Sequence, residues 1–157
     1  MTLPHYDYYT DNMPVNVGGD ARAFVNRYLP KYRDDVGIHR HEETHNAQWY
    51  AWLALGAVLA GVAYLVPQTS QYWPFPLLIG AVTHQLLYGN FSLLGIHYPG
   101  VARYRLWAEV AAYKVQLKAN PPDWLPGVDC VALYAGFLAA DYGLTLTPEA
   151  ALNLLKS

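Results

Sequence analysis

The chain has 157 residues, of which 54% are hydrophobic and 14% are charged, and its formal net charge is -2. This length fits one domain with a core large enough to fold without covalent or metal cross-links. The acidic balance argues against a nucleic-acid binder, which would carry a basic stripe. The single cysteine, Cys130, excludes an intrachain disulfide framework and a cysteine-rich zinc finger.

Residues 1–20 are predicted to form an extended, tyrosine-rich arm. They combine prolines and glycines with tyrosines and aspartates, and no helical or strand period runs through them. They also lack the basic start and apolar stretch of a signal peptide. Such an arm packs along its own domain or docks on a neighbour. Residues 21–157 are predicted to form a single helical domain, with a first helix over residues 20–28.

A charge-free segment runs from Thr44 to Ala102. It holds two apolar blocks, residues 49–66 and 77–96, separated by a polar, proline-rich stretch over residues 67–76. This pattern predicts an apolar helical hairpin. Aromatic residues near the ends of the blocks and arginines on both flanks are consistent with insertion into a membrane through residues 49–96. Burial through self-association or within a larger assembly is the alternative, and both remain open.

Three further helices are predicted after the hairpin. Residues 103–118 show apolar positions at helical spacing. Residues 130–144 are expected to form an apolar helix, and Thr147 is expected to cap a short last helix that begins at Pro148. Because strand–helix alternation and internal repeats are missing from the sequence, the expected fold class is mostly α, a compact helical domain with an arm. The apolar positions of the 103–118 helix are Leu106, Val110, Tyr113 and Leu117.

The clearest chemical signal is the segment His41-Glu42-Glu43-Thr44-His45, which matches the HExxH pattern. Four residues turn an α-helix by about 400°, so His41 and His45 share one face and can both reach one zinc ion at about 2.0–2.1 Å. Glu42 is rotated by about 100° from His41 and can take a proton from a water activated by that ion. Two aspartates just before the motif offer N-caps. The alternative is a surface helix with these side chains on its solvated side.

A catalytic zinc site keeps three protein ligands, and Glu109 is the predicted third ligand. It lies within the otherwise apolar segment 107–113, where an unpaired buried carboxylate would be costly. A zinc ion would supply the cation that such a carboxylate needs. An ion pair with Arg105 on the same helix, or simple exposure to solvent, is the alternative.

Two segments together, His41-Glu42-Glu43-Thr44-His45-Asn46-Ala47-Gln48 and Glu109-Val110-Ala111-Ala112-Tyr113, resemble small gluzincin-type zinc metallopeptidases. The resemblance covers these two short motifs and their order. It implies that His41, His45 and Glu109 are metal ligands and that Glu42 is the general base. The charge-free insert between the motifs departs from the compact soluble members and is more like membrane-linked HExxH peptidases.

Other side chains near the motifs are weaker candidates. Tyr113, four residues after Glu109 on the same face, could donate a hydrogen bond to a developing oxyanion. Asn46 and Gln48 could orient an imidazole, and His84 is either a fourth ligand or, as we favour, a core histidine. Further candidate donors are Tyr104, Arg105, His39 and His97.

These features support three functional hypotheses. The first is a zinc-dependent hydrolase that cleaves a peptide bond in a peptide or protein substrate. The second is a structural or assembly component, for example of a phage virion or a secretion apparatus. It would contact partners through the arm and the hairpin, with zinc as a staple or with a cell-wall peptidase activity. The third is an integral membrane peptidase. The hypotheses share the expectation of a homo-oligomer, a larger assembly or a membrane around the apolar hairpin.

Overall fold

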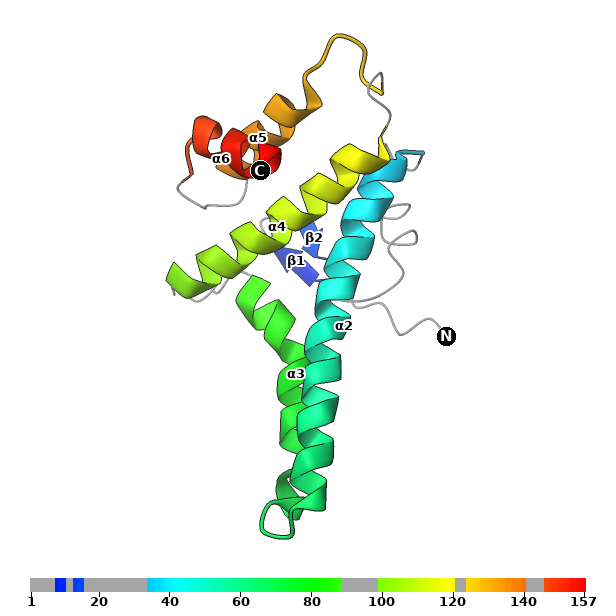
Figure 1. Ribbon diagram of the computed structural model, residues 1–157, viewed down its shortest axis with the longest axis vertical. Helices are drawn as coiled ribbons and strands as arrows, with labels where there is room; N and C mark the ends of the chain where they lie inside the picture. The colour runs from blue at the N-terminus through cyan, green and yellow to red at the C-terminus, as the bar shows by residue number, and fades with distance from the viewer. Residues whose placement is uncertain (1–7, 11–12, 16–33, 89–98, 121–123, 141–145) are drawn as a thin grey trace.

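The computed structural model describes residues 8–10, 13–15, 34–88, 99–120, 124–140 and 146–157. The mostly α-helical fold class is confirmed, with long helices that form a head and a protruding stalk (Figure 1). The elements in chain order are β1 (Tyr8–Thr10), β2 (Met13–Val15), α2 (Val36–Leu65), η2 (Ser70–Tyr72), α3 (Pro74–Tyr88), α4 (Pro99–Ala119), α5 (Cys130–Ala140) and α6 (Pro148–Lys156).

The start of α2 is fixed to the end of α4. The Asp35 side chain caps α2 by accepting a hydrogen bond from the backbone N–H of Ile38 at 3.1 Å, as one of the two predicted caps. Asn120 accepts a second bond, from the N–H of Gly37, at 2.8 Å. A Cβ atom at Gly37 would lie 2.3 Å from the Asn120 side-chain oxygen, so the glycine permits this contact. The helix that carries the HExxH motif is therefore anchored at its first turn.

The predicted apolar hairpin is present, formed by the C-terminal part of α2 and by α3 (Figure 1). Helix α3 begins at Pro74, inside the stretch predicted to be a turn. Prolines are tolerated in the first turn of a helix because the missing N–H groups have no partner there, and this explains the early start. Residues 89–96 of the predicted second block lie outside the described residues.

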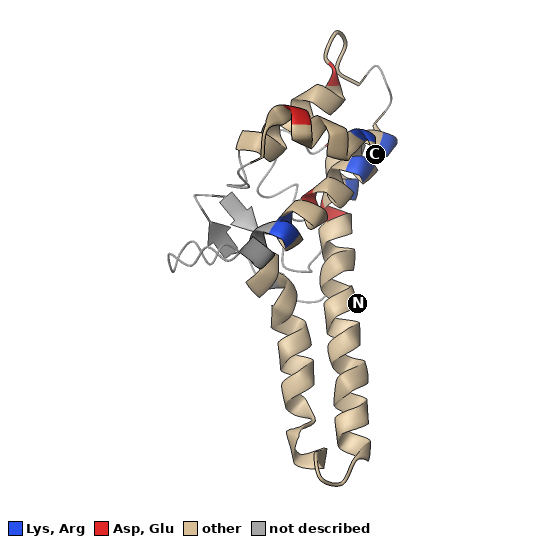
Figure 2. Cartoon of the chain, turned by 60° about the vertical axis from the view of Figure 1, so that its left-hand side comes forward, with Lys and Arg blue, Asp and Glu red and all other residues tan. Residues whose placement is uncertain are grey.

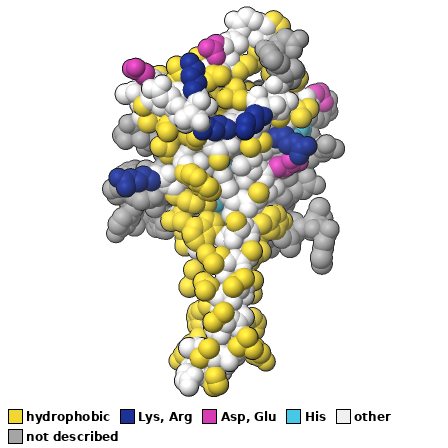
Figure 3. Space-filling view, viewed as in Figure 1, with side chains coloured by type: hydrophobic (Ala, Val, Ile, Leu, Met, Phe, Trp, Pro, Cys, Tyr) yellow, Lys and Arg dark blue, Asp and Glu magenta, His cyan; other side chains and the backbone are white. Residues whose placement is uncertain are grey.

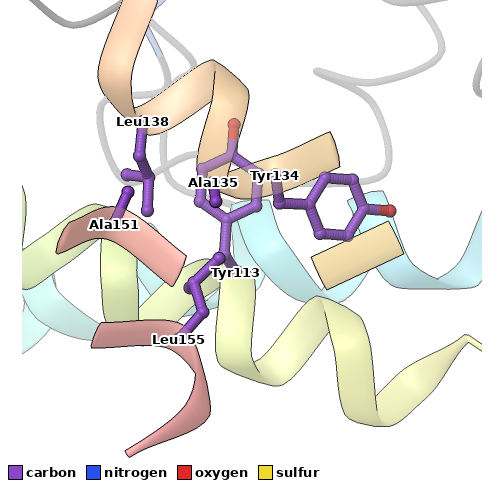
Figure 4. Close-up of a cluster of buried hydrophobic side chains, with 6 residues drawn as sticks. All are labelled: Tyr113, Tyr134, Ala135, Leu138, Ala151 and Leu155. Carbon is purple, nitrogen blue, oxygen red and sulfur yellow. The ribbon is translucent and has the colours of Figure 1, made fainter. Parts of the chain in front are cut away.

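Helix α4 is covered on two sides. Helices α2 and α3 pack on one side, and α5 and α6 pack on the other. The contact with α5 and α6 is a cluster of buried apolar side chains (Figure 4). Its members are Tyr113, Tyr134, Ala135, Leu138, Ala151 and Leu155.

The prediction of which face of α4 is buried is only partly correct. Tyr113 is buried, whereas Leu106, Val110 and Leu117 are half-buried. The other buried positions of α4 are small or polar, because α2 approaches closely and its polar side chains meet polar partners. These positions are Ala108, Glu109, Ala112 and Gln116.

The last helix begins as predicted. The Thr147 hydroxyl accepts a hydrogen bond from the N–H of Ala150 at 3.2 Å, and Pro148 is the first helical residue. The predicted end of the 130–144 helix and the predicted helix over residues 20–28 lie outside the described residues, since α5 is described up to Ala140.

The N-terminal arm contains a short antiparallel pair of strands that the sequence analysis missed. Strand β1 pairs with β2, with Tyr8 opposite Val15 and Thr10 opposite Met13. Strands of three residues are too short to show a recognisable alternation, and Pro14 argues against a strand. The rest of the predicted arm, and residues 16–33 that follow β2, lie outside the described residues.

Candidate metal centre

The two motifs predicted to form a metal site meet where α4 crosses α2. His41 and His45 lie one turn apart on the side of α2 that faces α4, and Glu109 lies in the middle of α4. Their exposed fractions are 4%, 4% and 0%, so water is nearly excluded from all three side chains. The alternative of a solvated helix face for the HExxH motif is therefore wrong.

The three candidate ligand atoms lie close enough together to share one metal ion. His41 Nε2 lies 3.1 Å from His45 Nε2, and Glu109 Oε2 lies 3.4 Å and 3.7 Å from these two nitrogens. For comparison, tetrahedral zinc with bonds of about 2.0–2.2 Å would place neighbouring ligand atoms roughly 3.3–3.6 Å apart. The described side chains therefore form a group that can hold a metal ion, as the sequence predicted.

Two glutamines orient the imidazole rings. Gln116 Oε1 lies 3.0 Å from His41 Nδ1, and Gln48 Oε1 lies 3.1 Å from His45 Nδ1. An amide oxygen can only accept a hydrogen bond, so each Nδ1 carries the proton and each Nε2 has a lone pair for a metal. The Gln48 amide nitrogen donates to the Ala108 carbonyl at 3.2 Å, which fixes which end of this amide faces His45.

The buried apolar cluster between α4 and the two C-terminal helices holds Gln116 in place. The Gln116 amide nitrogen donates to the Tyr134 hydroxyl at 3.1 Å, and Tyr134 stacks on Tyr113 with ring centroids 5.1 Å apart. The Tyr113 ring also packs against the His41 ring in an edge-to-face arrangement, with centroids 4.6 Å apart. The C-terminal helices therefore help to position His41, although they carry no ligand.

Glu109 presents one oxygen to a tyrosine and the other to the two histidines. The Tyr88 hydroxyl of α3 donates a hydrogen bond to Glu109 Oε1. Glu109 Oε2 is buried and has no hydrogen-bond partner among the described residues. A buried carboxylate oxygen facing two Nε2 atoms fits a divalent cation, because the cation satisfies all three atoms at once.

The ionisation of these groups follows from their burial and proximity. Burial alone lowers the pKa of His45, but the Glu109 carboxylate more than offsets this effect and the pKa rises to about 9. Burial alone raises the pKa of Glu109, but the two histidines reverse this effect and hold it well below its usual range. Without a metal, a proton on His45 provides a positive charge that a metal ion would otherwise supply.

Glu42 and its neighbour Glu43 differ sharply in their surroundings. Glu42 is 9% exposed, and its carboxylate is one of the nearby charges that raise the pKa of His45 and of Tyr88. The Glu43 side chain is 51% exposed and bonds Arg40 at 2.7 Å. Glu42, the predicted base, is therefore buried close to the candidate metal centre, whereas the adjacent Glu43 points to solvent.

His84 is not one of the three converging ligands. Its Nδ1 lies 2.8 Å from the Tyr104 hydroxyl, which also accepts a bond from Trp52 Nε1 at 2.9 Å. Its ring stacks on Tyr88 with centroids 5.3 Å apart. His84 is fully buried, so it packs behind the tyrosine that holds Glu109, as expected for a core histidine.

The remaining candidates have varied surroundings. The Arg105 guanidinium lies over the Tyr88 ring, 5.5 Å from its centroid, while Asn46 is buried in α2. His97 lies outside the described residues. The donor roles predicted for Tyr113, Tyr104, Arg105 and His39 stay predictions.

Gln48 was predicted from the sequence as a residue that orients an imidazole, whereas Tyr88 and Gln116 were not predicted. Gln116 lies seven residues after Glu109, and this spacing places both residues on one face of a helix. The position of Gln116 near the site could therefore have been predicted from the sequence. Tyr88 lies in an apolar block, and its role depends on how α3 packs on α4, for which the sequence carries no local signal.

Comparison with protein-family models, with curated proteins and with solved structures found no match to this chain.

Proposed function

We propose that this protein is a zinc-dependent hydrolase that cleaves peptide bonds, with His41, His45 and Glu109 as ligands and Glu42 as general base. The observation that carries the proposal is the convergence of His41 Nε2, His45 Nε2 and Glu109 Oε2 within 3.1–3.7 Å of one another. Two nitrogens and one carboxylate oxygen form a ligand set that zinc hydrolases use. The resemblance to gluzincins implies the same roles.

The catalytic role of Glu42 rests on its position. When bound in this centre, zinc would supply Lewis-acid activation of a water molecule and of a substrate carbonyl. Glu42 is buried near the three proposed ligands but is not one of them, in contrast to Glu109. Its carboxylate can therefore accept the proton of the attacking water. The same carboxylic acid can then return the proton to the leaving amine.

Tyr88 and the glutamines act through the ligands. Tyr88 occupies Glu109 Oε1 and so directs Oε2 toward the histidines, while Gln48 and Gln116 hold the two rings in the tautomer that ligates through Nε2. These are positioning residues.

A second candidate function is a structural zinc site in an assembly protein. The burial of all three ligands at the crossing of α2 and α4 favours it, because such a site would also tie the helices together. The two functions differ in what they require of Glu42, since a structural site needs only its ligands.

The decisive experiment compares Glu42→Gln with Glu43→Gln. We expect wild-type protein to contain about one zinc per chain by elemental analysis and to cleave members of a mixed peptide pool detected by mass spectrometry. Glu42→Gln should retain the zinc and lose turnover by about 10²–10⁴-fold, the usual contribution of a general base.

Glu43→Gln is the matched control, because the same change falls on an exposed neighbour. It should retain both zinc and turnover. If Glu42→Gln cleaves peptides at the wild-type rate, Glu42 is not the base. If wild-type protein binds zinc but cleaves nothing in the pool, the structural role is favoured.

A further inference from the structure

The stalk, defined as residues 53–83, exposes large apolar side chains along its length. The exposed fractions are 64% for Val58, 79% for Leu65, 60% for Leu78 and 61% for Ile79. The stalk contains no Lys, Arg, Asp or Glu, and its surface is dominated by apolar side chains and backbone (Figures 2 and 3). Soluble monomers rarely leave an apolar surface of this extent in contact with water.

The interior of the stalk contains the smallest side chains. The buried positions of residues 53–83, all of which are described, are Gly56, Ala60 and Gly80. A Cβ atom added at Gly56 would lie 2.8 Å from the Cα of Gly80 and 2.6 Å from the Pro76 carbonyl oxygen. Helices in a bilayer show this arrangement, with small residues between them and large apolar residues outside. Paired helices in water show the opposite pattern.

The hydroxyl groups of the serine and threonines in the stalk bond to backbone carbonyls nearby. Thr83 donates to Ile79 at 2.6 Å, Thr69 donates to Ala63 at 2.9 Å, and Ser70 donates to Pro67 at 3.1 Å. These internal hydrogen bonds satisfy the hydroxyl groups inside a hydrocarbon layer, where no water is present to act as a hydrogen-bond partner. The two glutamines of the stalk, Gln68 and Gln71, are both at its tip.

Aromatic residues mark both ends of the hairpin. Trp49, Tyr50 and Trp52 lie at the base, and Tyr72 and Trp73 are 53% and 42% exposed at the tip. Tryptophan and tyrosine concentrate at membrane–water interfaces. At about 1.5 Å per residue, α2 rises roughly 24 Å from Trp49 to Leu65, which covers most of the ~30 Å hydrocarbon layer of a bilayer. In the described part of the chain, α2 is also the helix with the length and hydropathy of a membrane span.

We infer that the stalk inserts into a lipid bilayer as a helical hairpin from one side, with the head on the side of entry and the tip near the opposite interface. The acyl chains cover Val58, Leu78 and their apolar neighbours. An open apolar groove near the tip, lined by Ala57, Gly61, Trp73 and Leu77, adds contact surface for these chains.

Insertion would place the candidate metal centre next to the membrane surface. His45 precedes Trp49 by four residues, which is about 6 Å along the helix. A consequence that rests on the proposed function is that the substrate is a peptide segment held at or near the membrane surface. The insertion itself does not depend on the metal.

Flotation with lipid vesicles tests the insertion. We expect the purified full chain, reconstituted with vesicles of phosphatidylcholine and phosphatidylglycerol, to float with them through a density gradient. Val58→Lys places a charge near the middle of the span and should weaken partitioning by about 100-fold. Ile79→Lys on α3 is an independent second variant. Wild-type protein that stays at the bottom of the gradient would overturn the inference.

Val128→Lys is the matched control. Val128 is 45% exposed and lies in the head, just before α5, so the same substitution should leave flotation unchanged. Equal loss of flotation in Val128→Lys and Val58→Lys would contradict a role specific to the stalk. Retention of zinc in Val58→Lys, and of flotation in His45→Ala, distinguishes failure of this inference from failure of the proposed function.

A thiol-labelling experiment tests the position of the tip. Ser70→Cys in a Cys130→Ser background should be protected in vesicles from an external, membrane-impermeant maleimide and should react after detergent is added. In the wild-type protein the half-buried Cys130 of the head should react without detergent. External labelling of Ser70→Cys at the same rate with and without vesicles would overturn the inference.

Coverage of the stalk by a second copy of the chain is the rival outcome. It predicts a discrete oligomer in buffer without lipid or detergent that does not float and that Val58→Lys dissociates. That result would also overturn membrane insertion.

Discussion

The two halves of α2 bury opposite kinds of residue. The N-terminal half buries His41, Glu42 and His45, whereas the C-terminal half buries only Gly56 and Ala60. Both halves belong to one continuous helix (Figure 1). Burial along α2 therefore depends on which groups of the neighbouring helices face each position, and not on the hydrophobicity of the side chain. In the head, polar side chains meet polar partners, and in the stalk, two helix backbones come into close contact.

The cost of burying polar groups in the head is offset by specific partners. His41 faces Gln116, His45 faces Gln48, and the Tyr88 hydroxyl bonds Glu109. The stalk needs no such partners because it contains no charged residue and its serine and threonine hydroxyls bond to nearby backbone carbonyls. Substitutions in the head should therefore act through lost partners, and substitutions in the stalk should act through packing and solvation.

The largest effect is expected for Glu109→Ala. This change should abolish tight zinc binding and lower the free energy of unfolding by about 3–5 kcal/mol, because it removes the carboxylate that compensates two buried imidazoles. Elemental analysis and denaturant unfolding measure the two effects. Glu149→Ala, at an exposed position in the first turn of α6, is the control and should leave the zinc content unchanged and lower the free energy of unfolding by less than about 1 kcal/mol. Wild-type zinc content in Glu109→Ala would remove Glu109 from the ligand set.

The stalk offers a pair of identical substitutions with opposite expected signs. Gly56→Ala places a Cβ 2.6 Å from the Pro76 carbonyl oxygen and should destabilise the protein by about 1–3 kcal/mol. Gly61→Ala meets nothing within 4 Å and should stabilise α2 by about 0.5–1 kcal/mol, since alanine is the better helix former. Thermal unfolding in one lipid or detergent condition compares them. Equal shifts for both variants would contradict close packing of α2 on α3.

A smaller effect is expected at the glutamine that holds His41. Gln116→Ala should weaken zinc binding by about 10-fold, at the lower end of the 10–100-fold range seen when a partner of a metal ligand is lost. A chelator competition assay measures the affinity. Gln71→Ala at the tip of the stalk is the matched control, and an unchanged affinity in Gln116→Ala would show that this hydrogen bond does not tune the centre.

The candidate site was largely predictable because the positions of its candidate ligands follow simple rules. The four-residue spacing of His41 and His45 fixes them on one face, and the carboxylate of Glu109 stands alone in an apolar segment. The first residues of α2 and α6 were also predictable, because Asp35 and Thr147 cap the N-termini of these helices through local hydrogen bonds.

The parts that were missed depend on contacts between distant segments. The role of Tyr88 requires α3 to return to α4, and the buried face of α4 is set by two layers of helices instead of one. The apolar pattern Leu106, Val110 and Leu117 therefore identified a face that is only half-buried. The two strands of the arm, three residues each, carried too short a pattern to recognise.

X-ray absorption spectroscopy of the zinc-loaded protein tests the metal centre most directly. The expected spectrum contains two imidazole ligands at about 2.0–2.1 Å and oxygen ligands at about 2.0–2.2 Å, with one zinc per chain. His45→Ala, which lacks one of the three proposed ligands, should lose the stoichiometric zinc. A wild-type protein that binds no stoichiometric zinc, or a zinc shell without imidazole, would contradict the assignment of His41, His45 and Glu109 as ligands.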